Sequence, residues 1–440
     1  MREMKDSGIE WIGDIPASWE TRKIKQLADS NTENSFVDGD WIESPYIVDC
    51  GIRYLTTGNI GDGVFKEQGN GYITLKTFEE LACKYAFPGD LIISRLNAPY
   101  GRSCILPSDY TEYVVAVDNV ILRTQEDKRY ICYVSQCDGY KHTVEDDAKG
   151  TTMKRISRTN LGNIVIPLPP IQQQCRIADY LDRKCSQIDA IITRQQEVIE
   201  KLKAYKLSVI TEAVTKGLNP DVPMKDSGVE WIGEIPEHWN LIKATRIIIS
   251  TQNGLTRRDL DKSTGQIVLK LRNISSTGEI DYEYQNRIEL TKQELDTYRL
   301  KEGDFLFVRV NGSKSLVGKC TIFHSIGEDV AYNDHIIRVR ISEKCIPKFF
   351  FWFLLSICGK TEIDLHTSTS AGQYTISGEG LRDIRLVLPP KAEQLEIDAH
   401  LSKICSSIDK VIFQKQTSID KFTAYKKSLI YEVVTGKKEV

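Results

Sequence analysis

Two stretches of the chain have an apolar pattern that is typical of long helices packed against a partner. Their apolar side chains recur at alternating steps of three and four residues, which places them along one stripe of a helix. The first stretch has Ile177, Leu181, Ile188, Ile191, Val198, Leu202, Tyr205 and Val209, with Lys184, Gln195 and Glu212 at the remaining positions of the stripe. The second stretch has Ile397, Leu401, Ile404, Ile408, Val411, Phe422, Tyr425 and Leu429.

Proline and glycine mark the ends of both predicted helices. Two prolines precede each stripe, at residues 169–170 and 389–390, and proline is tolerated only at the entrance of a helix. Gly217 and Gly436 follow the stripes as C-terminal stops. The first helix is therefore expected from about residue 171 to 215, with a length of about 67 Å.

A helix of this length with one apolar stripe needs a partner, and the second helix is the obvious one. About 24 residues separate Lys216 from Asn240. A parallel pair would need a connection that returns along the full helix, whereas an antiparallel pair places the end of the first helix beside the start of the second. We therefore expect an antiparallel pair with a globular domain at either end and an approximate two-fold axis.

The two helices belong to an internal repeat with a period of 220 residues. Residues 4–19, MKDSGIEWIGDIPASW, return as residues 224–239, MKDSGVEWIGEIPEHW, with 12 of 16 positions identical. The sequence before each helix has the same offset, as LPPIQQQ from Leu168 and LPPKAEQ from Leu388. Each copy is thus ordered as tryptophan box, divergent middle and long helix.

The middles, residues 20–167 and 240–387, have diverged but keep a common skeleton of Asn-Ile, Gly-Asp and Ile-Ser pairs. These pairs begin at Asn59, Gly89 and Ile156 in the first middle and at Asn273, Gly303 and Ile376 in the second. Short β-branched runs between Gly, Asn and Asp turn signals predict mixed α/β domains made mostly of strands. The predicted fold class is α+β, with two such domains separated by the antiparallel coiled coil.

Composition narrows the class of protein. No apolar run approaches the ~20 residues of a membrane span and no signal peptide is seen, so we expect a cytoplasmic protein. The 11 cysteines include no C-x-x-C motif, which argues against a disulfide framework or a zinc ribbon. The net charge of −3 is not the basic balance of a protein that coats DNA. Any DNA binding must therefore depend on local charge or on partners.

The order of tryptophan box, variable domain and Leu-Pro-Pro helix, present twice, resembles that of type I restriction-modification specificity subunits. The W-I-G-x-I-P boxes and the paired Leu-Pro-Pro helices carry this resemblance, which covers essentially the whole chain. It implies target-recognition domains at residues 1–167 and 218–387 and conserved spacer helices at residues 168–217 and 388–440. It also implies that the chain reads an asymmetric bipartite site in double-stranded DNA, and that it docks two adenine-methyltransferase subunits and, for cleavage, restriction subunits.

The chain lacks the motifs of the reactions that such a complex performs. It contains no N-P-P-Y or D-P-P-Y adenine-methylase motif and no G-x-G-x-x-G loop. Residues 312–320 resemble a phosphate-binding loop but have one residue too many and end in Cys. The six histidines show no metal-ligand spacing. We therefore expect a non-catalytic subunit without a metal or cofactor, with S-adenosylmethionine, ATP and Mg²⁺ in the partner subunits.

Candidate DNA contacts follow from side-chain chemistry, because Arg, Lys, Asn and Gln read base edges and Lys, Arg, Ser and Thr contact phosphates. In the first middle the candidates follow the Gly-Asp strand or precede the long helix: Arg95, Asn97, Arg102, Thr151, Lys154, Arg155 and Arg158. In the second middle they are Arg257, Arg258, Arg309, Asn311, Lys314, Lys319, Gln373 and Tyr374.

Each of these residues has a plainer alternative as part of a solvated basic loop. Arg95 and Arg309 could equally be structural, since they occupy equivalent positions in domains that should read different sequences. The first middle has 17 Lys and Arg against 21 Asp and Glu, and the second has 21 against 18. Because neither middle is basic as a whole, we expect weak DNA binding by the chain alone.

Other functions stay open beside the leading one. The chain could be the specificity subunit of another multisubunit restriction system, or a coiled-coil scaffold that binds proteins and never reads DNA. The tryptophans of the two boxes are expected to pack against the domains rather than contact DNA: Trp11, Trp19, Trp231 and Trp239.

Overall fold

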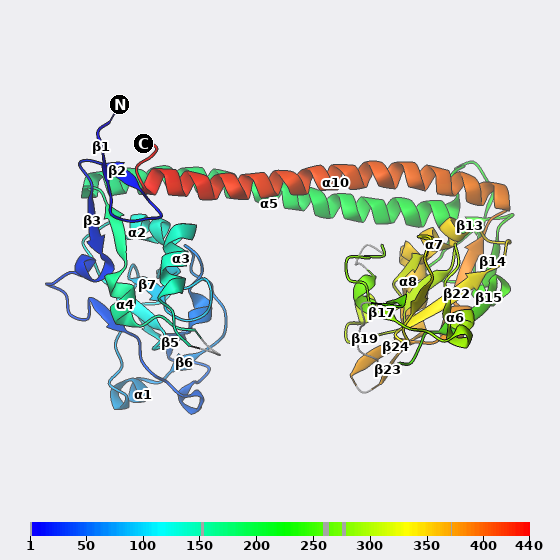
Figure 1. The fold of residues 1–440 in the computed structure, drawn as a ribbon, viewed down its shortest axis with the longest axis horizontal. Helices are drawn as coiled ribbons and strands as arrows, with labels where there is room; N and C mark the ends of the chain where they lie inside the picture. Colours follow the sequence, from blue (N-terminus) through cyan, green and yellow to red (C-terminus); the bar gives the residue numbers. More distant parts are fainter. Residues whose placement is uncertain (1, 151–153, 258–263, 275–278, 371) are drawn as a thin grey trace. The chain divides into compact units, whose positions relative to one another are not determined.

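The computed structural model describes residues 2–150, 154–257, 264–274, 279–370 and 372–440. Packing divides the chain into two units, residues 1–196 with 417–440 (unit 1) and residues 197–416 (unit 2). Each unit contains one tryptophan box, one divergent middle, the start of one long helix and the end of the other (Figure 1). The four segments predicted from the repeat therefore stay a prediction, since packing joins each middle to parts of both helices.

Unit 1 is built mainly from short strands, as its β-branched runs and turn residues predict. Its strands are β1 (Met4–Asp6), β2 (Asp14–Pro16), β3 (Glu20–Lys23), β4 (Phe36–Asp38), β5 (Ile52–Leu55), β6 (Tyr72–Ile73), β7 (Leu91–Ser94), β8 (Ser103–Ile105), β9 (Tyr113–Val115), β10 (Asn119–Leu122) and β11 (Val165–Leu168). Its helices are α1 (Leu75–Glu80), α2 (Lys128–Ser135), α3 (Asp138–Asp146), α4 (Arg158–Asn163) and the start of α5 (Ile171–Lys216), with 3-10 turns η1 (Ile24–Leu27), η2 (Ser44–Tyr46) and η3 (Thr57–Asn59).

Unit 2 has the same order of α-helices and adds the strands β19, β23 and β24. Its strands are β12 (Met224–Asp226), β13 (Glu234–Pro236), β14 (Asn240–Lys243), β15 (Ile248–Asn253), β16 (Gln266–Leu269), β17 (Arg287–Ile288), β18 (Phe305–Val308), β19 (Val310–Asn311), β20 (Cys320–Ile322), β21 (Val330–Tyr332), β22 (Ile336–Ile341), β23 (Thr367–Ser370), β24 (Gln373–Ile376) and β25 (Arg385–Leu388). Its helices are α6 (Lys292–Tyr298), α7 (Pro347–Leu355), α8 (Ile357–Leu365), α9 (Gly378–Asp383) and the start of α10 (Lys391–Val434), with 3-10 turns η4 (Ala244–Arg246), η5 (Leu271–Asn273) and η6 (Lys314–Leu316).

The same sheets recur in the two units. A four-stranded antiparallel sheet has the order β4-β10-β7-β8 in unit 1 and β15-β22-β18-β20 in unit 2. A three-stranded sheet, β6-β5-β9 or β17-β16-β21, contains one parallel pair in each unit. Unit 2 also has the sheet β19-β24-β23. The predicted class of two strand-rich mixed α/β domains is confirmed.

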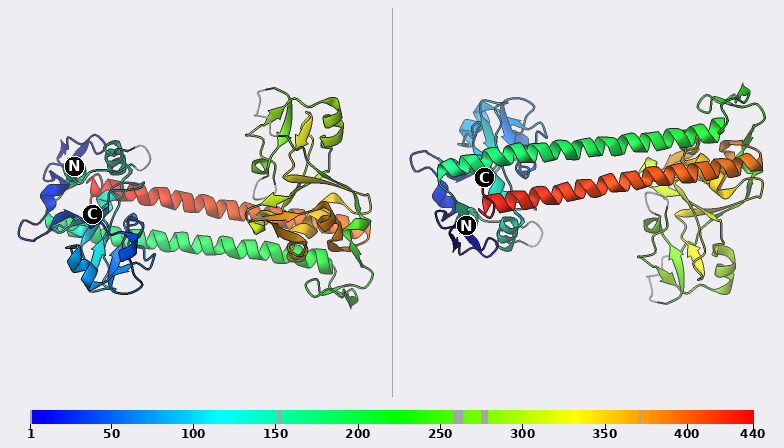
Figure 2. Two further views of the ribbon diagram at one scale, coloured as in Figure 1. Left: turned by 90° about the horizontal axis from the view of Figure 1, so that it is seen from below. Right: turned by 90° about the horizontal axis from the view of Figure 1, so that it is seen from above.

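The long helices pair antiparallel within each unit, as predicted. In unit 1, Leu181 near the start of α5 shares an apolar core with Val433 at the end of α10. In unit 2, Val214 at the end of α5 shares a core with Leu401 near the start of α10. Figure 2 shows the two helices side by side within each unit from below and from above. These cores continue into the strand-rich domains, so the helix pair belongs to the fold of each unit.

Two ion pairs reflect the repeat at this helix interface. Lys426 Nζ lies 2.7 Å from Asp189 Oδ2 in unit 1, and Lys206 Nζ lies 2.7 Å from Asp409 Oδ2 in unit 2. Each lysine therefore pairs with the aspartate of the other copy. Because the aspartates are about half exposed, each pair contributes only about 0–1 kcal/mol, and the interface depends mainly on its apolar seam.

The observed seam differs from the predicted one at several positions. Leu181, Ile188, Leu401 and Ile408 are buried as predicted, but six predicted positions of α5 are displaced by one residue. The side chains that face the seam more closely are Cys185, Ile192, Ile199, Lys206, Ile210 and Ala213, in place of Lys184, Ile191, Val198, Tyr205, Val209 and Glu212. Neighbouring apolar residues such as Ile191 and Ile192 fit the stripe equally well, so periodicity could not separate them.

The tryptophan boxes close the ends of the helix pair. Trp19 and Trp239 are fully buried, as expected, whereas Trp11 and Trp231 are half-buried. The indole Nε1 of Trp19 donates to Gln173 Oε1 and that of Trp239 donates to Glu393 Oε2, both over 2.9 Å. Each box is therefore tied to the first turn of the long helix of its own copy.

The last glutamine of each Leu-Pro-Pro sequence explains why that sequence recurs. Gln174 and Gln394 are at most 1% exposed. Their amide nitrogens donate to the carbonyls of Pro169 and Pro389, over 2.8 and 2.9 Å. The same amides accept a backbone N–H from the loop after the central sheet, so they fasten the helix start to the domain.

No helix in the described ranges combines the length and apolar character that crossing a bilayer requires. All eleven cysteines are free thiols, and Cys50 is exposed. Burial raises the pKa of Cys104 and of Cys320 to about 12, so these thiols stay protonated inside the sheets.

The glycine after α10 provides a test of how tightly the first box packs. Gly436 has φ +73°, and a Cβ there would lie 2.5 Å from Pro16 Cδ. We expect Gly436→Ala to lower the free energy of unfolding by about 2–4 kcal/mol, through backbone strain plus overpacking. Thermal unfolding of the full chain, followed by near-ultraviolet circular dichroism, measures the loss.

Gly13→Ala is the matched control, because Gly13 has φ +67° in the same box but nothing within 4 Å of an added Cβ. It should cost only the backbone term of about 1–2 kcal/mol. Equal losses in the two variants would contradict the close packing of Gly436 against Pro16.

Candidate nucleic-acid interface

In unit 1 the two predicted groups of DNA contacts lie side by side. The loop after β7 meets the segment before α4 through a bridge between Leu96 and Arg155. The N–H of Ile156 donates to the carbonyl of Arg95 over 3.1 Å. Residues about 60 positions apart in the chain therefore form one surface.

Unit 2 builds the same surface from its equivalent segments. Val310 pairs with Thr375 and Asn311 with Tyr374 where β19 meets β24. The N–H of Ile376 donates to the carbonyl of Arg309 over 3.0 Å, which matches the bond between Ile156 and Arg95 in unit 1. The structure thus brings together the two groups in both units, although their side chains differ.

The buried side chain of Arg95 links the segments that form this surface. Its side chain is 2% exposed and its guanidinium donates to the carbonyls of Val117 and Ile156. Burial lowers the pKa of Arg95, which the nearby Asp38 carboxylate partly offsets. The structural alternative considered for Arg95 therefore applies, and we do not include it among the DNA contacts.

Arg102 is buried too, at 9% exposure, although its loop is a predicted contact region. Its guanidinium donates to the carbonyls of Thr57, Ile60 and Asn97 over 2.8, 2.6 and 2.7 Å. Burial lowers the pKa of Arg102 as well. These bonds join the turn after β5 to the loop after β7, so Arg102 supports the surface rather than forming part of it.

The other described candidates of unit 1 face solvent. Asn97 and Lys154 are exposed. The side chains of Arg155 and Arg158 are 45% and 43% exposed, and each is paired with an aspartate. Thr151 lies outside the described residues. At this surface unit 1 therefore has the guanidinium groups of Arg155 and Arg158, the ammonium group of Lys154 and the amide of Asn97. They belong to the two segments that the Leu96–Arg155 bridge joins.

In unit 2 the candidates have a more neutral character. Arg309 is half-buried and donates to the carbonyl of Asp334 over 3.0 Å, which repeats the structural role of Arg95. Asn311 Oδ1 accepts the N–H of Ser313 over 2.9 Å and so shapes its own turn. Lys314 and Gln373 are exposed, whereas Lys319 and Tyr374 are half-buried.

The third group of unit 2 lies elsewhere. Arg257 is placed against α6, where Nη1 lies 3.2 Å from the carboxylate of Glu294 and donates to the carbonyl of Glu289. Backbone hydrogen bonding at Thr291, helped by Arg257, lowers the pKa of Glu294. The structure therefore does not bring Arg257 into the β19-β24 surface, and Arg258 lies outside the described residues.

The Asn-Ile pairs of the repeat have a structural purpose. Asn59 is 2% exposed, and its amide donates to the carbonyls of Lys66 and Gln68 over 3.0 and 2.8 Å. Asn273 does the same with Asp281 and Tyr284, over 2.8 Å each. These amides close equivalent loops in the two units, so the pair marks the framework and not the contact surface.

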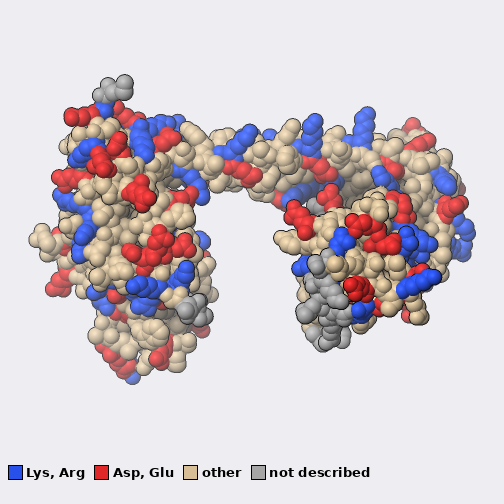
Figure 3. Space-filling view, viewed as in Figure 1, with Lys and Arg blue, Asp and Glu red and all other residues tan. Residues whose placement is uncertain are grey.

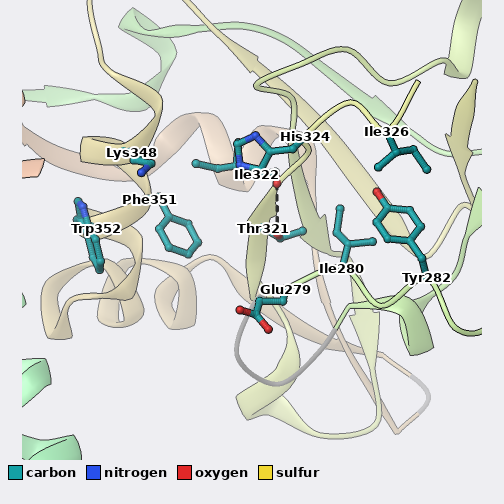
Figure 4. A pocket seen from close by; sticks show the side chains of 10 residues that line it. All are labelled: Glu279, Ile280, Tyr282, Thr321, Ile322, His324, Ile326, Lys348, Phe351 and Trp352. Atoms are coloured by element: carbon teal, nitrogen blue, oxygen red, sulfur yellow. Dashed lines mark hydrogen bonds between the residues drawn. The ribbon is translucent and has the colours of Figure 1, made fainter. Parts of the chain in front are cut away.

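A cavity of about 390 Å³ in unit 2 has a different character from this surface. Its walls are mainly apolar, and Figure 4 shows its lining: Glu279, Ile280, Tyr282, Thr321, Ile322, His324, Ile326, Lys348, Phe351 and Trp352. The Thr321 hydroxyl is directed to its own strand, at 3.5 Å from the carbonyl of Ile322. Such a lining does not match the charged backbone or the base edges of DNA.

Among the described residues, no three His, Cys, Asp or Glu side chains are grouped in a way that could hold a metal ion. On the face of the molecule drawn in Figure 3, lysine and arginine are interspersed with aspartate and glutamate over both units. Lysine and arginine are therefore not gathered into one broad basic patch on the part of this face that the structure describes.

The role of Arg102 can be tested by replacing its guanidinium group with a different positively charged group. We expect Arg102→Lys to lower the free energy of unfolding by about 2 kcal/mol, because an ammonium cannot donate to three separated carbonyls at once. Thermal unfolding and faster amide exchange in residues 57–60 and 96–98 measure this. Lys154→Ala, at an exposed site, should change stability by less than about 0.5 kcal/mol. Similar effects of both changes would refute the supporting role.

The chain is similar to known proteins along most of its length. A family model described as type I restriction modification DNA specificity domain matches residues 16–201. The specificity subunit of the type I restriction enzyme EcoKI from Escherichia coli strain K12 is 24% identical over 310 residues, which cover 70% of this chain and 65% of that relative. The StySPI specificity subunit from Salmonella potsdam is 26% identical over 308 residues, with the same coverage. The matched region thus spans just under two thirds of these relatives.

The fold has a close counterpart among solved structures. A chain from work on complex assembly and conformational transition of the type I R-M system superposes with a TM-score of 0.71, covering 96% of this chain and 99% of that chain at 12% identity. At this identity the likeness concerns the fold. The chain is thus similar to type I restriction-modification specificity subunits in the sequence of residues 16–201, in its curated relatives and in its fold.

Proposed function

We propose that this chain is the DNA-recognition subunit of a type I restriction-modification complex. Each unit reads one half of an asymmetric, bipartite DNA site, and the chain directs adenine-methyltransferase and restriction subunits to that site. The observation that carries the proposal is one framework, built twice, with different side chains at the same surface. Leu96 pairs with Arg155 in unit 1, whereas Val310 pairs with Thr375 in unit 2.

The different side chains support recognition of two different half-sites. Arg155 and Arg158 supply forked donors, which suit the paired acceptors of guanine in the major groove. Gln373 supplies an amide, which suits the donor and acceptor of adenine, and Tyr374 adds a hydroxyl. Equivalent segments with unlike chemistry are what an asymmetric target requires.

Charge supports a division of work between this chain and its partners. Phosphate contacts provide much of the affinity for DNA, and they need an excess of Lys and Arg. The chain has 58 Lys and Arg against 61 Asp and Glu. We therefore assign most phosphate contacts to the methyltransferase subunits, together with S-adenosylmethionine binding and methyl transfer. ATP and Mg²⁺ are assigned to the restriction subunits, and the complex to the cytoplasm.

Exposed apolar side chains on the long helices support docking of a repeated partner. Ile191 is 39% exposed and Tyr425 is 52% exposed in unit 1, and their equivalents in unit 2, Val411 and Tyr205, are 38% and 57% exposed. Single exposed apolar side chains are common on protein surfaces, so the support for docking comes from their recurrence at the same positions of the repeat. Because both units carry the same pair of positions, the partner that fits them is one methyltransferase subunit per unit.

The test is co-expression of the chain with a candidate methyltransferase subunit of the same host, followed by mapping of methylated adenines in host DNA. The expected result is methylation at a two-part motif with a fixed gap and unlike halves. Methylation of a single continuous or palindromic site would contradict two readers. A chain that assembles with the methyltransferase but leaves the DNA unmethylated would favour a scaffold.

Single changes at the surface should alter one half of the motif at a time. We expect Arg155→Ala to reduce recognition of one base pair in the half read by unit 1 by about tenfold or more, because a forked contact to a base is lost. The measurement is the rate of methylation of duplexes that carry each base at each position.

Gln373→Ala is the reciprocal variant, because Gln373 belongs to the equivalent segment of unit 2. It should alter only the other half. If either variant weakened methylation equally for every base at every position, its side chain would contact the DNA backbone and not a base edge.

A further inference from the structure

The surface of unit 1 contains an ion-pair network that links its exposed arginines to its core. Arg155 Nη1 lies 3.0 Å from Asp118 Oδ1, and Arg158 Nη1 lies 3.5 Å from Asp38 Oδ2. The other oxygen of Asp38 lies 3.0 Å from Nη2 of the buried Arg95. The two surface arginines are thus attached, through aspartates, to the framework that carries them.

The aspartates lie where they attract the arginines electrostatically and so limit the directions in which these side chains extend. Their side chains are 31% exposed for Asp38 and 19% for Asp118, whereas the arginines are 43% and 45% exposed. The carboxylates therefore lie deeper than the guanidinium groups and leave part of each fork open to solvent. The backbone of Asp118 is itself fixed, since its carbonyl accepts the N–H of Arg95 over 2.8 Å.

Matching backbone hydrogen bonds show which residues replace this network in unit 2. The N–H of Arg309 donates to His335 as that of Arg95 donates to Asp118, so His335 stands in the place of Asp118. Gly254 donates to Ile336 as Gly39 donates to Asn119, so Asn253 stands in the place of Asp38. Both carboxylates are therefore absent from unit 2.

The arginines are replaced at the same time as the aspartates. Thr375 occupies the position of Arg155, and Gly378, the first residue of α9, occupies that of Arg158, the first residue of α4. The structural Arg95 is kept as Arg309. Within one chain, the acids thus occur where the arginines occur, and Arg309 keeps its place in unit 2 with an asparagine at the position of Asp38.

An arginine that reads a base gains from being held in advance. A free arginine side chain loses rotamer freedom when it binds, which reduces affinity, and an unpaired guanidinium is attracted to every phosphate of any DNA. A carboxylate beneath the fork restricts its rotamers and lowers its net charge. Both effects favour contacts that depend on geometry, such as the paired acceptors of guanine, over contacts that depend on charge alone.

We propose that Asp118 and Asp38 are positioning residues that hold Arg155 and Arg158 for recognition of guanine in the half-site read by unit 1. This inference rests on the proposed function. Asp118 and Arg155 form the pair through which it is best tested, because Asp38 also contacts the buried Arg95 and its loss would disturb the core.

The experiment measures methylation by the full complex on duplexes that carry each of the four bases at every position of the motif. Asp118→Asn should reduce the preference for one guanine in the half read by unit 1 by about fivefold to tenfold. It should also raise binding to unrelated DNA at low salt, since a negative charge beside the DNA is lost. Asp118→Glu, which keeps the charge, should restore a large part of the preference.

Two controls separate positioning from stability. His335→Asn, at the equivalent place in unit 2, should leave the half read by unit 1 unchanged. In an Arg155→Ala background, Asp118→Asn should have no further effect on base preference, because Asp118 affects base preference only through Arg155. A merely structural Asp118 would instead lower methylation of all duplexes equally and add its effect to that of Arg155→Ala.

The possible outcomes separate a failure of the positioning role from a failure of the proposed DNA-recognition function. If the wild-type complex methylates no two-part motif, the proposed function fails and the inference fails with it. If the wild-type complex does so but Asp118→Asn keeps the full base preference, only the positioning role is overturned. A preference lost in the half that Gln373→Ala alters would also overturn it, because Asp118 belongs to unit 1.

Discussion

A helix of 46 residues with one apolar stripe has to cover that stripe, and this requirement organises both units. In each unit the stripe of one helix meets the opposite end of the other, and the resulting seam runs directly into the core of the strand-rich domain. The tryptophan boxes, the buried glutamines of the Leu-Pro-Pro sequences and the closing glycines all lie at this junction. Their recurrence at a fixed period follows from packing, since each unit must pack the same end of the helix pair against its strand-rich domain.

The surface that meets DNA in our proposal obeys a different requirement. Arg95 and Arg309 are kept because they fasten the surface loop to the sheet from inside. The side chains directly before and directly after the matching Ile-Ser pairs are free to differ, because nothing in the core depends on them. One fold can therefore support two recognition chemistries, provided that the anchoring arginine and the backbone pairing beside it stay in place.

Much of the architecture could be predicted from the sequence, because long-period signals are strong. The helix bounds, their antiparallel pairing and the strand-rich domains follow from proline and glycine positions, apolar periodicity and the repeat. The seam register could not be resolved, since Ile191 and Ile192 fit the stripe equally well and only the partner helix decides between them. Burial of Arg102 could not be foreseen either, because its carbonyl acceptors, among them those of Thr57, Ile60 and Asn97, belong to two loops that meet only in the fold. For the same reason, Asp38 and Asp118 carried no local signal, lying 120 and 37 residues from their arginine partners in the chain.

The composition of unit 1 has a consequence for the time at which it can fold. Its core combines Ile12 and Trp19 with Leu429 and Val433, although all of unit 2, residues 197–416, is synthesised between them. At about 5–20 residues per second, translation of that insertion takes roughly 10–45 s. During this interval the ribosome has delivered most of the first domain but not the helix end that completes its core. Unit 2 is continuous in the chain, so it can fold as soon as its last residue has left the ribosome. Unit 1 begins earlier but can complete its core only after the end of α10 has been synthesised.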